Sequence, residues 1–286
     1  MLWIFDRFRV RSILQLFGMI FGIVYSFDVM AQDAINTREP LQNSTLQNAS
    51  IRSNALSHKP HPWLNDMPPA FARLVDIGRV EIAVDQAAVD AANRTALTVF
   101  SFSLAYQMKY RFNEITKGDD GKRRVRITVS YFDVDVSPAH RILLSESYRP
   151  TKPWDAALMQ HEFDHVAIST DPRMFAMLLS LNAKKAILIA NPNELIKISD
   201  DWVKGQIENS SKDFQQAVEK LVQTYYVRLD DVSNHGLKTI EDRTRFFTEL
   251  FTLEDLAKSK FAYLDNARKS LPSINPDQIK QHYRLP

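Results

Sequence analysis

The run His161-Glu162-Phe163-Asp164-His165 combines the residue types and spacing of a zinc hydrolase site. Residues four apart on a helix project from the same face, so both imidazoles can reach one metal ion. Zn2+ accepts neutral imidazole nitrogens, and Glu162 stands where it can take a proton from a zinc-bound water. The pattern therefore predicts His161 and His165 as metal ligands and Glu162 as the catalytic base.

A catalytic zinc usually takes a third protein ligand, and the absence of cysteine limits that ligand to His, Asp or Glu. Asp171 has the spacing used by metzincins, but Ile168 stands where that arrangement requires a glycine. Asp171 before Pro172 is also typical of a helix N-cap. Glu194 is a second candidate, although its Asn-Pro-Asn-Glu context is typical of a loop.

His235 is the preferred third ligand. It follows a long predicted helix whose apolar face can pack across the HExxH helix, and Gly236 permits a tight turn or a close backbone approach. Asp230 and Asp231, one turn earlier, are predicted to orient its imidazole through hydrogen bonds. The alternative is a helix-terminal histidine that complements the helix dipole.

Two stretches of the chain resemble bacterial predicted secreted zinc-dependent proteases, a family catalogued as a domain of unknown function. The first is Lys152-Pro153-Trp154 followed by the HExxH run, and the second runs from Asp230 through Ser233-Asn234-His235-Gly236. The resemblance covers residues 80–251. It implies a zincin-like fold and protease activity, and it favours His235 as a ligand.

The composition is that of a globular protein, with 286 residues, 45% hydrophobic and 24% charged residues. The formal net charge of +2 gives no reason to expect nucleic acid or a membrane surface as a partner.

The HExxH run predicts a zinc metallopeptidase that acts on peptides or proteins. The alternative is a non-catalytic exported metal-binding or scaffold protein, because no oxyanion stabiliser is identified, although tyrosines are available at Tyr131, Tyr148, Tyr225 and Tyr226.

The N-terminal part of the chain predicts export to the periplasm or the cell exterior. Residues 1–31 have the form of a signal peptide, with three arginines before an uncharged stretch and small residues near Ala31. An uncleaved anchor is the alternative and the only membrane association expected. Residues 32–60 are rich in Asn, Gln, Ser and Thr and predict a flexible tether, in which His58 is expected to be solvated, as is His61 just beyond it. The metallohydrolase domain then spans residues 61–286.

The elements that must position the site follow from hydrophobic periodicity. Alternation with a period of two predicts strands at 80–84, 100–112 and 125–131, with a hairpin turn at 117–121 and a further strand at 141–148. Trp154, Leu158, His161, His165 and Ile168 share one face of the predicted HExxH helix.

Three more helices are predicted after the HExxH helix. One runs from Asp171 to about Ala190, a long one covers 207–225 and ends near 233–236, and one follows Asp242 and contains residues 246–251. The expected fold class is α+β and zincin-like, with an antiparallel β-sheet, an HExxH active-site helix and a C-terminal helical bundle.

Overall fold

The computed structural model describes residues 4–13, 66–115, 123–183, 185–192 and 196–284. Within the predicted signal segment, residues 4–13 form a strand, β1 (Ile4–Ile13). The predicted tether with His58, His61 and the hairpin turn at 117–121 lies outside the described residues. No helix in the described part of the chain is long and apolar enough to cross a membrane.

The protein is α+β, with one mixed sheet of five strands in the order β1-β3-β4-β2, while β5 also pairs with β4. The other four strands are β2 (Val80–Val84), β3 (Ala96–Ile115), β4 (Arg124–Leu144) and β5 (Lys185–Ala190). The prediction of an antiparallel sheet is wrong at β2, which runs parallel to β4, while the other pairs are antiparallel. The separate strand predicted at 141–148 is the end of the continuous β4, which stops at Leu144.

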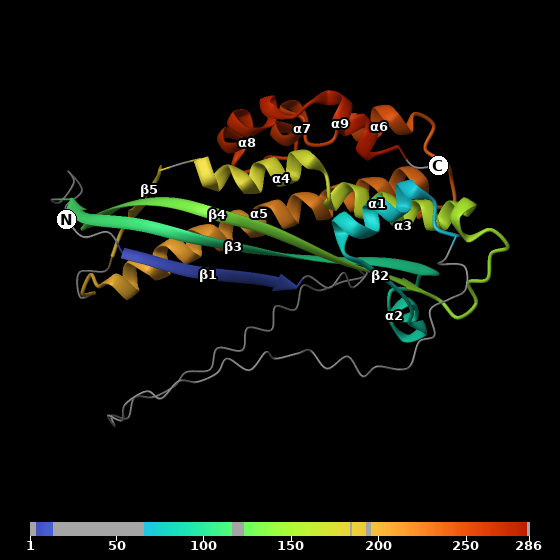
Figure 1. Ribbon diagram of the computed structural model, residues 1–286, viewed down its shortest axis with the longest axis horizontal. Coiled ribbons are helices and arrows are strands. Elements are labelled where there is room, and N and C mark those ends of the chain that lie inside the picture. The colour runs from blue at the N-terminus through green and yellow to red at the C-terminus, as the bar shows by residue number, and fades with distance from the viewer. Residues whose placement is uncertain (1–3, 14–65, 116–122, 184, 193–195, 285–286) are drawn as a thin grey trace, which may run out of the picture.

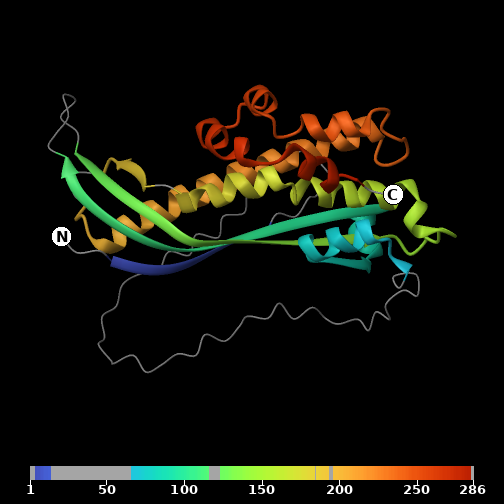
Figure 2. The same ribbon diagram turned by 45° about the horizontal axis from the view of Figure 1, so that its top comes forward.

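Helices cover one face of the sheet in two layers, as Figures 1 and 2 show. The layer next to the sheet holds α3 (Ala157–Ser169), α4 (Pro172–Leu179) and α5 (Asp200–Ser233). Outside it lie α6 (Arg243–Glu249), α7 (Leu253–Lys258), α8 (Leu264–Ser270) and α9 (Pro276–His282). The helices α1 (Pro69–Gly78) and α2 (Gln86–Ala91) flank β2, and single 3-10 turns occur at Pro153–Asp155, Ser180–Ala183 and Leu271–Ser273.

The two-residue period of β3 and β4 determines which side chains enter the core. The even-numbered residues of β3 from Phe100 to Tyr110 are buried, and so are Val125, Ile127, Val129 and Tyr131 of β4. The register places Tyr110 opposite Val129, so these side chains share the face that the helices cover.

The helix predicted from Asp171 to about Ala190 ends at Leu179, and residues 185–190 form β5 instead. A short apolar run does not distinguish a helix from a strand by periodicity alone. Pairing with β4 decides the outcome, because it faces Leu188 and Ala190 toward the core and leaves Ile187 and Ile189 exposed.

The helix α5 confirms the long helix predicted around 207–225. Its N-cap Ser199 accepts a hydrogen bond from the Trp202 amide, and Asp200 and Asp201 occupy the positive end of the helix dipole. A helix of this length spans about 50 Å. It therefore joins two core clusters, because Val203 and Ile207 pack at the far end of the sheet while later apolar residues pack with α3.

Candidate metal centre

The HExxH residues lie on α3, which is buried on all sides rather than along one apolar stripe. Every residue from His161 to Ser169 is buried. Such a helix is held by neighbours on each side. Phe163 contacts Phe71 of α1, with ring centroids 4.6 Å apart, and Phe71 contacts Trp154 at 5.3 Å. The orientation of both histidines is therefore determined by core packing.

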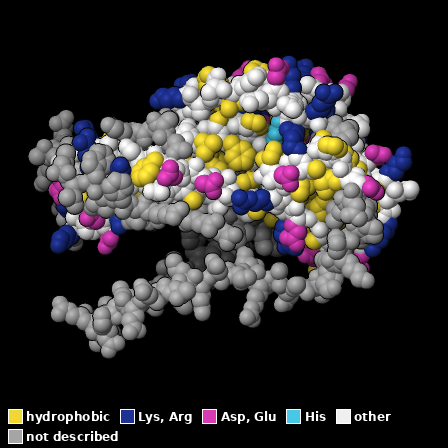
Figure 3. All heavy atoms as spheres, in the orientation of Figure 1, with side chains coloured by type: hydrophobic (Ala, Val, Ile, Leu, Met, Phe, Trp, Pro, Cys, Tyr) yellow, Lys and Arg dark blue, Asp and Glu magenta, His cyan; other side chains and the backbone are white. Residues whose placement is uncertain are grey.

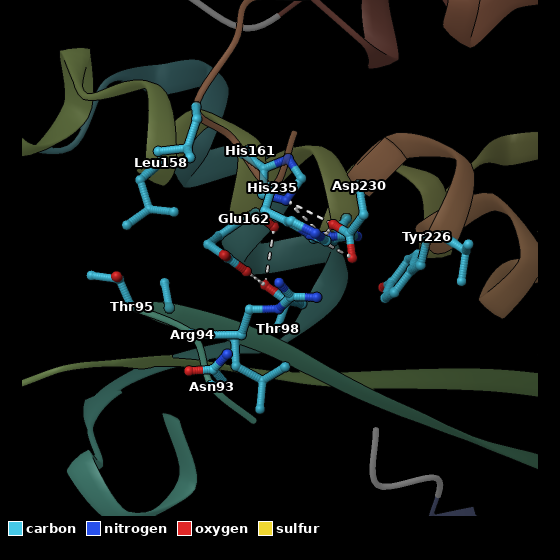
Figure 4. A pocket seen from close by; sticks show the side chains of 15 residues that line it. Asn93, Arg94, Thr95, Thr98, Leu158, His161, Glu162, Tyr226, Asp230 and His235 are labelled. Carbon is cyan, nitrogen blue, oxygen red and sulfur yellow. Dashed lines mark hydrogen bonds and ion pairs between the residues drawn. The ribbon is translucent and has the colours of Figure 1, made fainter. Parts of the chain in front are cut away.

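His161, His165 and Asp230 bring three potential ligand atoms together (Figure 4). The Nε2 atoms of the two histidines lie 3.1 Å apart. Asp230 Oδ1 lies 3.0 Å from His161 Nε2 and 3.1 Å from His165 Nε2. Ligand atoms at about 2.0–2.1 Å from a tetrahedral zinc are separated by roughly 3.3 Å. The triangle is thus close to the size that one such ion requires.

The hydrogen bonds around Ser233 determine where the proton of His161 resides. The Ser233 hydroxyl donates to the Leu229 carbonyl at 2.7 Å and accepts from the Gly236 amide at 3.1 Å. With its only proton used, Ser233 accepts from His161 Nδ1, 3.1 Å away. In the neutral imidazole, Nε2 of His161 therefore carries a lone pair directed at Asp230, a contact that a cation or a shared proton would stabilise.

The charge of Asp230 suits a metal ligand. Burial alone raises the pKa of this carboxyl group, but hydrogen bonds from His161 and His165, made when their Nε2 atoms carry protons, outweigh burial and hold the pKa well below its usual range. Burial lowers the pKa of His161, whereas the hydrogen bond to Asp230 and nearby carboxylates raise it, with a net upward direction. Asp230 is therefore an anion at neutral pH, as an oxygen ligand of zinc must be.

His235, the predicted third ligand, is not part of this triangle. Its side chain is 39% exposed, and its Nδ1 lies 3.4 Å from Asp230 Oδ2, whereas the contacts to the histidine pair are made by Oδ1. Asp230, which the sequence predicted to orient His235, lies beside it and also contacts both His161 and His165 directly. Asp231 is exposed.

One signal in the sequence indicates this role of Asp230. Tyr226, Asp230 and Ser233 follow one another at spacings of four and three residues, so they share one face of α5. All three contact the histidine pair, since the Tyr226 ring packs on His165 with centroids 4.4 Å apart. Polar residues on an otherwise apolar helix face are the pattern that identifies the group.

Gly236 lies directly against His161, as its predicted close approach requires. Its φ is +78°, and a Cβ added there would lie 2.8 Å from His161 Cβ. Asn234 and His235 also have positive φ values, so the chain leaves α5 in a left-handed turn over the histidine. Only glycine adopts this conformation at this contact without strain.

The other two candidate ligands differ in outcome. Asp171 is fully buried and caps α4, accepting from the Arg173 amide at 2.7 Å. It also accepts from the Arg173 guanidinium at 2.7 Å and from the Tyr283 hydroxyl at 2.5 Å. The predicted helix cap is thus confirmed, and Asp171 is absent from the group formed by His161, His165 and Asp230. Glu194 lies outside the described residues.

Glu162 is buried beside the triangle formed by His161, His165 and Asp230, and it is held by Thr98 of β3. The Thr98 hydroxyl donates to Glu162 Oε2 at 2.6 Å, and Glu162 also lines the cavity at the site. A carboxylate that is fixed by one hydrogen bond and open to a cavity can still exchange a proton with a bound molecule.

The four tyrosines available as oxyanion stabilisers have different partners. Tyr131 bonds to Ser211, and Tyr225 donates to Asp255, so both are engaged elsewhere. Tyr226 lines the cavity but donates to Ser169 at 2.8 Å. The Tyr148 hydroxyl is buried and has no hydrogen-bond partner among the described residues, and burial together with Glu162 raises its pKa to about 12.

A buried polar chain behind α3 supports the packing of Tyr226. The Ser169 hydroxyl accepts from Tyr226 and lies 2.6 Å from His140 Nε2, while His140 Nδ1 donates to the Gly78 carbonyl at 2.6 Å. Burial lowers the pKa of His140 to about 4, so this imidazole is neutral. The chain connects α5, α3, β4 and α1 around the histidine pair.

The triangle formed by His161, His165 and Asp230 opens into a cavity of about 250 Å³ between β3, α3 and the end of α5. The six consecutive residues 93–98 form its wall on the strand side. Leu158, Val227 and Leu237 contribute apolar side chains to the remaining surface, and Val227 and Leu237 are exposed. Figure 4 shows Arg94 extending from the strand side into this space.

A second hollow of about 380 Å³ lies beside α4. Figure 3 shows hydrophobic side chains gathered on this face of the molecule, with a histidine among them. No carboxylate lines this hollow in the described part of the chain, and its lining histidine, His282, is bonded to the Ala167 carbonyl at 2.8 Å. We assign no chemistry to it.

Comparisons with family models, with curated proteins and with solved structures give no match to this chain.

Proposed function

We propose that the protein is a zinc-dependent peptidase, exported to the periplasm or the cell exterior, in which Glu162 is the catalytic base. The observation that carries this proposal is the triangle of His161 Nε2, His165 Nε2 and Asp230 Oδ1, with edges of 3.0–3.1 Å, next to the buried Glu162. Two imidazoles and one carboxylate are a ligand set found in catalytic zinc sites, which leave one position open. A zincin-like fold is part of the same proposal.

The proposed reaction assigns a separate role to each group. A zinc ion held by His161, His165 and Asp230 would polarise the scissile carbonyl and lower the pKa of water to about 7. Glu162 accepts a proton from the attacking water as the C–O bond forms. The same carboxyl group then donates that proton to the leaving amine as the C–N bond breaks. Thr98 keeps the carboxylate facing the cavity through its hydrogen bond to Oε2.

The edge of β3 supports a peptide as the substrate. In the described part of the chain, β1 pairs with this edge only from Ser101 to Tyr110, so residues 96–100 have no strand on that side. Residues 93–98 also wall the cavity. A free strand edge can bind an extended peptide through main-chain hydrogen bonds, and the apolar side chains opposite can accept its side chains.

The decisive experiment compares wild type with Glu162→Gln, which keeps the shape of the side chain but removes the base. We expect both proteins to bind zinc equally, while proteolysis of unfolded casein falls by a factor of about 10² or more in the variant. Glu241→Gln, a neutral substitution at an exposed carboxylate, is the matched control and should cleave normally.

Equal proteolysis by wild type and Glu162→Gln would contradict the proposal. Zinc binding without turnover in a broad peptide screen would instead favour the alternative, a non-catalytic exported metal-binding or scaffold protein.

A further inference from the structure

The side chains that line the cavity would carry a net positive charge together with a bound divalent metal ion. The charged lining residues are Glu162, Asp230 and Arg94, apart from the histidines. A zinc ion at the triangle would offset the two carboxylates, which leaves one positive charge at Arg94. This step rests on the proposed function, because the balance requires the metal.

The backbone of Arg94 is fixed, while its side chain is free to meet a ligand. The turn between α2 and β3 is closed by hydrogen bonds from the Arg94 amide to the Val89 carbonyl and from the Asn93 amide to the Asp90 carbonyl, both 2.9 Å long. Asn93 has a φ of +52°, which asparagine tolerates. The Arg94 side chain is exposed, and no carboxylate in the described part of the chain pairs with it.

We infer that Arg94 selects peptides that carry a carboxylate near the scissile bond. Arginine presents parallel N–H donors that match the two oxygens of a carboxylate, and such a pair is stronger than a neutral hydrogen bond. The chemistry is shared by an acidic side chain and by a free C-terminus. Arg94 stands at the start of the open edge of β3, so a peptide lying along residues 96–100 would place one of its ends close to this guanidinium.

The apolar side chains opposite Arg94 add a second requirement for a bound peptide. Val227 is 54% exposed and Leu237 is 78% exposed, so both can cover an apolar side chain of a bound peptide. The favoured ligand therefore combines one carboxylate with one apolar side chain, rather than charge alone.

Binding of labelled peptides tests the inference without requiring turnover. The probe is the zinc-loaded Glu162→Gln protein, and the readout is the fluorescence anisotropy of peptide pairs that differ in one group. The first arm compares Glu with Gln at each position of an apolar peptide whose C-terminus is an amide. The second arm compares the free C-terminal acid with the amide of the same peptide.

In the Glu162→Gln background, we expect one arm to show about tenfold tighter binding of the anionic peptide. Adding Arg94→Gln should abolish this ratio, and Arg94→Glu should reverse it toward peptides with Lys. Arg126→Gln, which removes an exposed arginine at the far end of β4, is the matched control and should keep the full ratio. The arm that responds identifies the source of the carboxylate.

An unchanged ratio in Arg94→Gln overturns the inference, as does equal binding of all peptide pairs or no binding of any peptide. These outcomes are separable from failure of the proposed function. Casein cleavage by wild type without a charge preference refutes only the role of Arg94. A preference that depends on Arg94 in a protein that cleaves nothing refutes only the peptidase.

Discussion

Gly236 packs against His161 so closely that a methyl group on Gly236 would lie 2.8 Å from the histidine Cβ. Real Cβ atoms do not approach each other this closely, so one of the two residues would have to move. The turn after α5 and His161 are therefore fitted to each other.

Gly236→Ala should displace His161 and weaken zinc binding about tenfold, the lower range for changes beside metal ligands. The positive φ of Gly236 adds backbone strain to the steric conflict. Competition with a chelating dye measures the affinity. Gly205→Ala is the control, because no described atom beyond its chain neighbours and the adjacent backbone of its own helix lies within 4 Å of the added Cβ, and alanine favours a helix. Equal affinities in the two variants would contradict the fit described here.

Asp230→Asn should lower zinc affinity by a factor of about 10² or more, because it replaces the anionic ligand of the triangle. Asp231→Asn, at the exposed neighbouring position, should bind zinc like wild type. His235→Ala tests the third ligand that the sequence predicted. We expect this variant to lose only a little zinc affinity. Zinc stoichiometry and calorimetric titration provide the values. A complete loss in His235→Ala with retention in Asp230→Asn would restore His235 as the third ligand.

Arg243→Met should destabilise the protein by about 3 kcal/mol, since it leaves Asp164 buried without its partner. Arg243 donates to Asp164 on the HExxH helix and to the Tyr283 carbonyl after α9. It thereby ties α3 to the outer layer of helices. Urea unfolding measures the change. Arg245→Met is the matched control, because Arg245 pairs with Glu249 at the surface and should have little effect. Equal destabilisation by both variants would remove this role from Arg243.

Stability should fall as the pH drops from about 6.5 to about 4, in part because of His140. Burial lowers the pKa of this imidazole to about 4 from 6.5. The unfolded chain therefore binds more protons in this window, which favours unfolding by up to ~3 kcal/mol, with no further change below pH 4. Urea unfolding of wild type and His140→Gln, both with chelator so that metal release does not contribute, should give a flatter pH profile for the variant. Parallel profiles would contradict this assignment.

Local patterns in the sequence predict the helices that carry the histidine pair and Asp230. The four-residue spacing of His161 and His165 placed them on one helix, and the repeating apolar positions predicted α5. Both inferences need only contacts within one element, which is why they succeeded. The two-residue period of β3 identified its buried face for the same reason.

Relations between distant elements were harder to predict. Whether Asp230 or His235 lies beside the histidine pair depends on the rotation of α5 about its own axis where it crosses α3. The spacing of residues within either helix does not determine that rotation. The apolar run of β5 predicts a helix, because its two faces acquire different environments only through pairing with β4. The parallel pairing of β2 likewise follows from packing of the whole sheet rather than from its five residues.

The separation of the ligands along the chain gives a bound metal a mechanical role. Asp230 lies 65 residues beyond His165, on a different helix. An ion that joins them would act as a reversible crosslink between α3 and the last turns of α5. Because the unfolded chain lacks this arrangement, the binding free energy would add to the stability of the fold. A low zinc concentration would then loosen the contact between the two helices and would also abolish the proposed hydrolysis.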